Sequence, residues 1–362
     1  MKCHRCVRSW RAGAVACALL AVLPVAGCGP EPRLLAPAQP AGMTVRPACA
    51  RPGAALGAGQ LQDAYQAQPM FARGITGAGT VIAVIMPAAA PRVAADVTVY
   101  SRRYGLPAPR VRELAYGHVP PPAGREAAGW EEEGTVDLEM AHALAPKAAL
   151  VYLAVPPGAG ATGAGLQNDA ALAWLVTRYR IDVVSYSAGI PEAWARQGGY
   201  RAITASRGGL QAAARAGTTV VAAAGDYGTA EPQPDGTLYP GPVVAWPASD
   251  PLVTAVGGTR LTTTAGRVAT TADGYADVLS GGRAGGAGLS AVFPRPPWQD
   301  RVANVTGPHR GIADVSMDAS PCSPVAAYTS INVLPGRKPG WITIAGTSVA
   351  APLFAGITAD VA

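Results

Sequence analysis

Charged side chains are scarce in this sequence. Only 14% of its 362 residues are charged and 49% are hydrophobic, a composition that excludes an intrinsically disordered chain. Glycine and proline are numerous, with 44 and 34 residues, but they follow no collagen-like period, which favours a loop-rich globular fold. A concentrated basic face is also missing, because 25 basic and 23 acidic residues follow residue 27. Phosphate binding needs clustered positive charge, so the composition argues against a nucleic-acid partner.

The N-terminus has no apolar run long enough to span a bilayer comfortably. Four basic residues precede a short apolar stretch at 12–23, a pattern typical of a secretory signal. The stretch ends in Val-Ala-Gly before Cys28, which resembles a lipobox. We therefore expect export, removal of residues 1–27 and lipidation of Cys28, which would anchor the protein in the cell membrane on its extracytoplasmic face. The alternative is an ordinary signal that is cleaved near Ala26.

Residues 28–59 are rich in proline and alanine and predict a semi-extended tether. The composition changes at Gln60, so we expect one folded domain over 60–362. Cys49 and Cys322 are the cysteines left once the signal is removed and Cys28 is lipidated. An oxidising compartment would allow them to form a disulfide, and the alternative is two unpaired thiols.

Short β-branched, apolar runs predict buried strands at 80–85, 149–155, 182–186 and 218–223. Helical patterns lie between them at 134–144, 168–178 and 200–215. This alternation predicts an α/β fold with a mostly parallel sheet that is covered by helices on both faces. In such folds the functional side chains gather at the carboxyl ends of the strands.

Two acidic residues, Glu133 and Asp137, are four positions apart where the helix over 134–144 is predicted to start. On a helix this spacing puts both side chains on one face, with Cβ atoms roughly 6 Å apart. Carboxyls that close tend to share a proton, which raises one pKa and suits general acid–base chemistry. The alternative is structural, because acidic residues in a first helical turn complement the helix dipole.

Asp226 and Ser348 are the other candidates. Asp226 follows the strand predicted at 218–223, where it either lines a site or forms an Asx-turn with the next backbone groups. Ser348 lies in a turn of small residues before an apolar helix, where serine commonly serves as a cap. The same place exposes a hydroxyl to the positive end of the helix dipole, which suits a nucleophile.

The turn around Ser348 carries a specific motif. Residues 346–352 match the G-T-S-x-x-x-P signature of the subtilisin-like clan of serine peptidases. Subtilisins combine that serine with a histidine in an H-G-T motif, but His118, His142 and His309 are not followed by Gly-Thr here. A serine–histidine–aspartate triad is therefore disfavoured.

The chain instead resembles the sedolisins, the serine-carboxyl peptidases of family S53. Their motif E-x-x-x-D-(I/L)-E, followed by A-L-A-P-x-A, is matched by residues 133–139 and 143–148. Their A-A-x-G-D-x-G segment is matched around Asp226, and the likeness continues in the same order through 60–362. The resemblance implies a subtilisin-like, three-layer α/β/α fold with a mostly parallel central sheet.

The resemblance also assigns a role to each candidate. Ser348 would attack the peptide carbonyl and Glu133 would accept its proton, while Asp137 would hold Glu133 in place. Asp226 would donate a hydrogen bond to the oxyanion, which requires its carboxyl to be protonated. We therefore expect a monomeric endopeptidase with an acidic optimum that acts on protein or peptide substrates.

Several features depart from the family pattern. The family's prodomain is missing, since only the tether precedes the catalytic domain. The family's calcium site lies beyond Ala362, so we expect no calcium ligands in this chain, and its end inside an apolar helix favours a fragment over a calcium-free member. No other cofactor is implied, and the histidine spacing offers no zinc site. Ala188 stands where S-x-S-W-G has an aromatic residue, which predicts a changed substrate pocket.

These departures motivate a rival hypothesis, a catalytically silent surface lipoprotein that uses the fold as a binding module. Retention of Glu133, Asp137, Asp226 and Ser348 argues against it. A glycine-rich run at 281–288 resembles a phosphate-binding loop, but no helix follows it. We interpret this run as a linker or turn.

Overall fold

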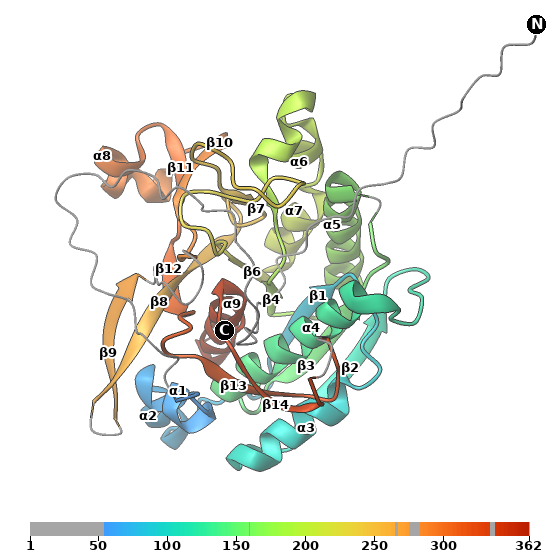
Figure 1. The fold of residues 1–362 in the computed structure, drawn as a ribbon, viewed down its shortest axis with the longest axis vertical. Helices are drawn as coiled ribbons and strands as arrows, with labels where there is room; N and C mark the ends of the chain where they lie inside the picture. The colour runs from blue at the N-terminus through green and yellow to red at the C-terminus, as the bar shows by residue number, and fades with distance from the viewer. Residues whose placement is uncertain (1–53, 159, 265–266, 275–282, 334–336, 362) are drawn as a thin grey trace, which may run out of the picture.

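The computed structural model describes residues 54–158, 160–264, 267–274, 283–333 and 337–361. A central sheet has the strand order β12-β8-β6-β4-β1-β3-β2, with β9 beside β8 (Figure 1). Its strands are β1 (Val81–Met86), β2 (Arg110–Ala115), β3 (Ala149–Ala154), β4 (Val183–Tyr186), β6 (Thr219–Ala223), β8 (Thr254–Thr264), β9 (Arg267–Gly274) and β12 (Val315–Asp318). Within the described chain, every pairing in this sheet is parallel except that of β9 with β8. The four predicted strands are confirmed as β1, β3, β4 and β6.

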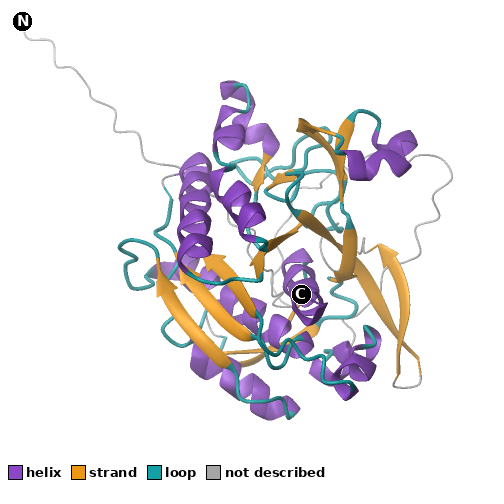
Figure 2. Ribbon diagram, turned by 180° about the vertical axis from the view of Figure 1, so that it is seen from behind, coloured by secondary structure: helices purple, strands orange, loops and turns teal. Residues whose placement is uncertain are grey.

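Helices cover both faces of the sheet, as the sequence predicts (Figure 2). Alternate residues of β1 enter different cores: Ile82 and Val84 pack with α1 (Ala58–Ala64), α3 (Val93–Tyr104), α4 (Gly124–Leu144) and α9 (Thr347–Val361). Ala83 and Ile85 pack on the other face with α5 (Gly160–Arg178) and α7 (Gly208–Ala216). This two-residue alternation between two apolar layers produces the three-layer α/β/α architecture.

Short elements complete the fold. They are α2 (Ala67–Ala72), α6 (Arg201–Ala205), α8 (Ala303–Thr306), the 3-10 helices Glu192–Gly198 and Pro297–Val302, and the antiparallel pairs β5 (Ile190–Pro191) with β7 (Ala245–Trp246), β10 (Gly288–Pro294) with β11 (His309–Ile312), and β13 (Val325–Thr329) with β14 (Gly340–Ile344). The helix predicted over 200–215 is thus two helices. The break lies at Arg207, whose side chain is held by Asp250 instead of continuing the helix surface.

Helix α4 begins at Gly124, well before the predicted start at 134. Glu133 therefore lies in the middle of the helix, where every residue from Glu131 to Leu144 is buried. The interpretation of these acidic residues as first-turn partners of the helix dipole is wrong, because the first turn lies farther back along the chain. A run of acidic residues resembles a helix start in the sequence, but here the run lies in the buried middle of a longer helix.

The N-terminal boundary of the packed domain precedes Gln60. Leu56 is buried, and its backbone makes hydrogen bonds to Pro324 and Ala326 beside β13. Cys322 is disulfide-bonded. Cys49 lies outside the described residues, as do Cys28, the signal and most of the tether, so the Cys49–Cys322 pairing stays a prediction. No helix in the described ranges is long and apolar enough to cross a membrane.

Helices α4 and α9 approach each other closely through Gly356. A Cβ atom at Gly356 would lie 2.8 Å from the backbone oxygen of Ala141 and 2.9 Å from Leu144 Cβ. Moving the backbone atoms of a packed helix costs considerable free energy, so only glycine permits this close approach. Helices α4 and α9 lie side by side (Figure 1), and Ser348 at the start of α9 acts on Glu133 in the middle of α4.

We expect Gly356→Ala to lower the free energy of unfolding by about 1–3 kcal/mol, because the added methyl group overpacks the α4–α9 contact. Gly59→Ala in α1 is the matched control, since a Cβ at Gly59 meets nothing within 4 Å. This control should raise the stability by about 0.5–1 kcal/mol through its better helix propensity. Urea unfolding of both variants measures the difference, and equal stabilities would contradict the described packing.

Candidate active site

The predicted site residues meet at the carboxyl ends of the central strands. A cavity of about 170 Å³ is lined there by Glu133 from α4, Ser187 after β4, Asp226 after β6 and Ser348 from α9. The apolar wall of the cavity comes from both sheet faces and includes Trp130, Leu172, Tyr186, Ile190, Trp194, Leu210 and Trp246. The structure therefore brings Glu133, Asp226 and Ser348 together in one pocket, with Asp137 buried behind them.

Glu133 and Asp137 form an electrostatically coupled pair in the interior. Burial raises the pKa of Glu133 to about 8, assisted by the charges of Asp226 and Glu132 and opposed by a hydrogen bond from Ser348. Burial, and then the charge of Glu133, raises the pKa of Asp137 well above its ordinary value, while a hydrogen bond from Ser187 opposes the rise. Two such carboxyls cannot both ionise readily, so the pair retains at least one proton across the acidic range.

Asp226 connects the loop after β6 to the start of α9. Its Oδ1 atom accepts a hydrogen bond from the Thr347 backbone N–H at 2.7 Å, and the Thr347 hydroxyl lies 3.0 Å from the same atom and 3.1 Å from the Gly225 backbone oxygen. A Cβ atom at Gly346 would lie 3.1 Å from Asp226 Oδ2 and 3.4 Å from Ser348 Oγ, so both oxygens face the space above this glycine. Oδ1 is thus the Asp226 oxygen that accepts the Thr347 backbone N–H, and Oδ2 is the one nearer the space above Gly346.

Ser348 is the second residue of α9, so it is not the cap of that helix. Gly346, with a φ of +143°, occupies the turn before it. Only glycine adopts this backbone conformation at low cost, and the absent side chain leaves room for a substrate oxygen. The turn thus presents the Ser348 hydroxyl at the positive end of a helix.

Residues 283–288 of the glycine-rich run pack against the Asp226 loop, which adds a specific contact to the linker or turn expected there. The backbone N–H of Gly286 donates to the Gly225 oxygen at 2.7 Å, and that of Ala284 donates to the Asp226 oxygen at 3.0 Å. A side chain at Gly286 would overlap the Ala224 backbone. These glycines permit the close approach of two backbones beneath the site.

Two further polar residues of the site, Glu231 and Ser187, are not predicted from the sequence pattern. Glu231 lines the pocket five residues after Asp226, and burial together with the charge of Asp226 raises its pKa to about 8. It lies in a polar loop that gave no sign of burial. Ser187 donates to Asp137 and sits beside Ala188, where the analysis noted only the missing aromatic side chain. Ala188 lines the pocket, and the prediction of changed substrate preference stays open.

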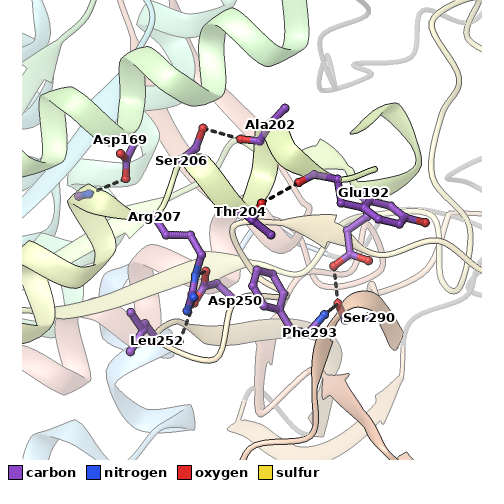
Figure 3. A network of polar contacts seen from close by, with 12 residues as sticks. Asp169, Glu192, Ala202, Thr204, Ser206, Arg207, Asp250, Leu252, Ser290 and Phe293 are labelled. Atoms are coloured by element: carbon purple, nitrogen blue, oxygen red, sulfur yellow. Dashed lines mark hydrogen bonds and ion pairs between the residues drawn. The ribbon is translucent and has the colours of Figure 1, made fainter. Parts of the chain in front are cut away.

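A polar network supports the pocket wall that α5, α7 and β5 contribute (Figure 3). Asp169 lines the pocket and accepts a hydrogen bond from the Gly209 backbone at 2.6 Å, at the start of α7. The buried carboxyl of Glu192, next to β5, accepts the Ser290 hydroxyl at 2.6 Å and the Ala291 N–H at 2.7 Å. These contacts fix the wall relative to β10.

Arg207 and Asp250 complete the same network. The guanidinium makes two hydrogen bonds to the buried carboxylate, at 2.6 and 2.9 Å, and lies 5.0 Å above the Phe293 ring (Figure 3). The ion pair is bidentate and partly buried, so its geometry is better defined than that of a solvent-exposed ion pair. It holds the start of α7 against the loop that follows β7.

The described residues do not supply a metal site. Among them no group of three or more histidine, cysteine, aspartate or glutamate side chains could hold a metal ion. The calcium implied by the sequence resemblance therefore does not fit this part of the chain, and no chemical step is derived through it.

The buried, protonated state of Glu231 predicts a pH-dependent stability. Because its pKa is raised to about 8 from an ordinary 4.5, the native state holds a proton that the unfolded chain releases between those values, so stability falls as pH rises. We expect Glu231→Gln to raise the free energy of unfolding at pH 8 by at least about 1 kcal/mol and to change it little at pH 4. Asp63→Asn, at an exposed carboxyl of α1, is the control. Equal effects at both pH values would contradict the burial of a neutral Glu231.

Three comparisons with known proteins agree with this geometry. The model of the subtilase family matches residues 123–362. Kumamolisin from Bacillus sp. (strain MN-32) is 34% identical over 308 residues, which cover 83% of this chain and 50% of that protein. Sedolisin from Pseudomonas sp. (strain 101) is 36% identical over 154 residues, which cover 41% of this chain and 24% of that protein. The chain therefore spans half the length, or less, of the curated relatives it matches.

A solved structure extends the likeness to three dimensions. Pseudomonas sedolisin, a serine-carboxyl proteinase complexed with two molecules of pseudo-iodotyrostatin, superposes with a TM-score of 0.70 at 26% identity. The match covers 84% of this chain and 80% of that one. The predicted subtilisin-like α/β fold is confirmed. The chain belongs to the subtilase family, within its sedolisin-like group of serine-carboxyl peptidases.

Proposed function

We propose that the protein is an endopeptidase that hydrolyses peptide bonds at acidic pH, with Ser348 as nucleophile, Glu133 as general base and acid, Asp137 as its partner and Asp226 as oxyanion donor. The observation that carries the proposal is the convergence at Gly346. Ser348 Oγ and Asp226 Oδ2 both face the space above it, while Ser348 also donates a hydrogen bond to Glu133. A nucleophile, a base and an oxyanion donor around one empty position is the arrangement that acyl transfer requires.

The reaction follows from these positions. Ser348 Oγ bonds to the scissile carbonyl carbon as its proton passes to Glu133. The carbonyl oxygen becomes an oxyanion, which accepts a hydrogen bond from the protonated Oδ2 of Asp226. Glu133 then protonates the departing amine as the C–N bond breaks. Water attacks the acyl-enzyme, gives a proton to Glu133 and a hydroxyl to the acyl carbon, and Ser348 recovers its proton as it leaves.

An acidic working range follows from the protonation states that this cycle needs. Asp226 must carry a proton to donate, and the Glu133–Asp137 pair must carry one proton rather than two or none. Acid favours both conditions, and burial raises the pKa values of Glu133 and Asp137.

Peptide hydrolysis by the full chain between about pH 3 and 5, compared with Ser348→Ala, tests the proposal. We expect the substitution to lower kcat by about 10⁴-fold or more, because the residual rate comes from substrate binding and the oxyanion donor alone. Pseudo-iodotyrostatin, the compound complexed with Pseudomonas sedolisin, serves as a probe of the site. Equal rates for both proteins would leave only the catalytically silent binding module.

Two substitutions of Asp226 serve as the internal comparison. Asp226→Ala removes the donor and should lower kcat by about 10²–10³-fold. In Asp226→Asn the Thr347 backbone N–H holds the amide oxygen at the Oδ1 position, so the amide N–H₂ group takes the Oδ2 position and donates without needing a proton. The ratio of its kcat/KM to that of the unmodified protein should therefore rise between about pH 4 and 7. A ratio that does not change with pH would contradict the assignment of Asp226 as a protonated donor.

We also propose that the protein is an exported monomer anchored to the cell membrane by lipid on Cys28, without a resident cofactor in this chain. The support is the sequence pattern of a basic segment, a short apolar stretch and a small-residue turn before this cysteine. We expect Cys28→Ser to shift the protein from the membrane fraction to the soluble fraction and to abolish incorporation of labelled palmitate. Unchanged labelling would refute anchoring at Cys28.

A further inference from the structure

The hydroxyl of Ser187 has no part in the chemistry above, although it touches two of the residues that carry it. Its oxygen lies 2.9 Å from Asp137 Oδ1 and 3.2 Å from the backbone oxygen of Ser348. Three distant segments meet at this hydroxyl: the end of β4, the middle of α4 and the first turn of α9. It is therefore the direct link between the acidic pair and the backbone that carries the nucleophile.

The Ser348 carbonyl needs such a donor because of its place in the helix. In an α-helix the carbonyl of one residue accepts the N–H of the residue four positions later. That residue here is Pro352, which lies inside α9 and has no N–H. The Ser187 hydroxyl lies where it can donate in place of the missing backbone group.

One hydroxyl proton cannot serve two acceptors at once, so its orientation depends on Asp137. When the Ser187 proton points to Asp137 Oδ1, that oxygen is an acceptor and the proton of the carboxyl belongs on Oδ2. When Oδ1 is itself protonated, Asp137 donates to Ser187 and Ser187 donates to the Ser348 carbonyl. The shorter of the two distances, to Asp137, favours the first orientation.

The second oxygen of Asp137 is placed for exchange with Glu133. Asp137 Oδ2 and Glu133 Oε1 are buried and have no hydrogen-bond partner among the described residues. The two residues share one face of α4, and their titrations are linked. Two carboxyl oxygens that are shielded from solvent and unbonded, on residues of one helix face whose charges repel each other, are the natural sites of a shared proton.

We propose that Ser187 is a positioning residue whose hydroxyl donates to Asp137 Oδ1, which leaves Oδ2 to hold the proton shared with Glu133. Its consequence for rate rests on the proposed function. The hydrogen-bonding arrangement itself does not depend on that function and can be measured in a protein without activity.

The ionisable groups around Asp137 set the direction of the expected change. Glu133 faces it from α4 and Tyr152 from β3, and Asp226 and Glu132 act on it through Glu133. All of these groups are neutral or negative, so Ser187 supplies a donor where no nearby charge favours the ionised form. Removing this donor should therefore raise the pKa of Asp137 and move the acidic limb of the rate profile to higher pH.

A pair of variants with equal bulk isolates the hydroxyl. Ser187→Thr keeps an O–H group, whereas Ser187→Val replaces it with a methyl group of similar size. Ser185→Ala is the control from the same strand, because the Ser185 hydroxyl is buried without a hydrogen-bond partner in the described chain. We expect Ser187→Val to lower kcat/KM about tenfold or more with little change in KM, Ser187→Thr to stay near the unmodified rate, and Ser185→Ala to leave the pH profile unshifted.

The decisive measurement does not require activity. The Asp137 carboxyl is titrated by ¹³C NMR in Ser348→Ala protein labelled at aspartate Cγ, with its resonance identified by its loss in Asp137→Asn. We expect its midpoint to be about one pH unit or more higher with Ser187→Val than with Ser187→Thr. Equal midpoints overturn the proposal, whether or not the protein cleaves peptides. A shifted midpoint in a protein that cleaves nothing supports the positioning role and refutes the proposed function alone. If either variant at 187 fails to fold, the same comparison between Ser187→Ala and Ser185→Ala decides the question.

Discussion

Burial of the carboxyl-bearing face of α4 is the constraint on which the site depends. The helix buries Glu133 and Asp137 on one face, where the pKa of each is raised chiefly by the loss of water. A carboxyl in such surroundings is favoured in its neutral form, so acid stabilises the fold through the same groups that the proposed chemistry uses. The stability that these groups provide in acid and the proposed activity at low pH therefore have one common cause, the burial of these carboxyls.

Glycine makes this arrangement possible by letting backbones take the place of side chains. Gly356 allows α9 to pack closely on α4, and Gly286 allows its loop to pack on the loop that carries Asp226. Gly346 leaves space where a substrate oxygen would bind in the proposed mechanism. At each place a single methyl group would meet backbone or catalytic atoms. The abundance of glycine, which in the sequence suggests only a loop-rich fold, thus has specific causes at the site.

The parts of this protein that can be predicted from sequence are those fixed by local pattern. The four apolar strands were predictable from periodicity, which is a property of neighbouring residues, and Glu133, Asp226 and Ser348 from the resemblance of their motifs to those of the sedolisins. The start of α4, the packing of 283–288 and the burial of Glu231 were not, because each depends on a contact with a segment far away in the chain. Ser187 shows the limit most clearly. Its importance follows from Pro352, which removes a donor 165 residues later in the sequence, and from Asp137, 50 residues earlier.

The placement of arginine distinguishes the carboxyls that maintain the fold from those that line the pocket. Asp250 is paired with Arg207, Asp314 with Arg310 and Glu132 with Arg337, so burial of these acids is offset by a guanidinium. No arginine or lysine lines the pocket in the described part of the chain. Glu132 and Glu133 are neighbours in sequence, yet a guanidinium opposes the rise in pKa only for Glu132, while Glu133 faces a hydroxyl and other acids. The position of Arg337 therefore distinguishes two adjacent glutamates. Glu132 is held in an ion pair, whereas Glu133 has no guanidinium beside it and is available for proton exchange in the proposed mechanism.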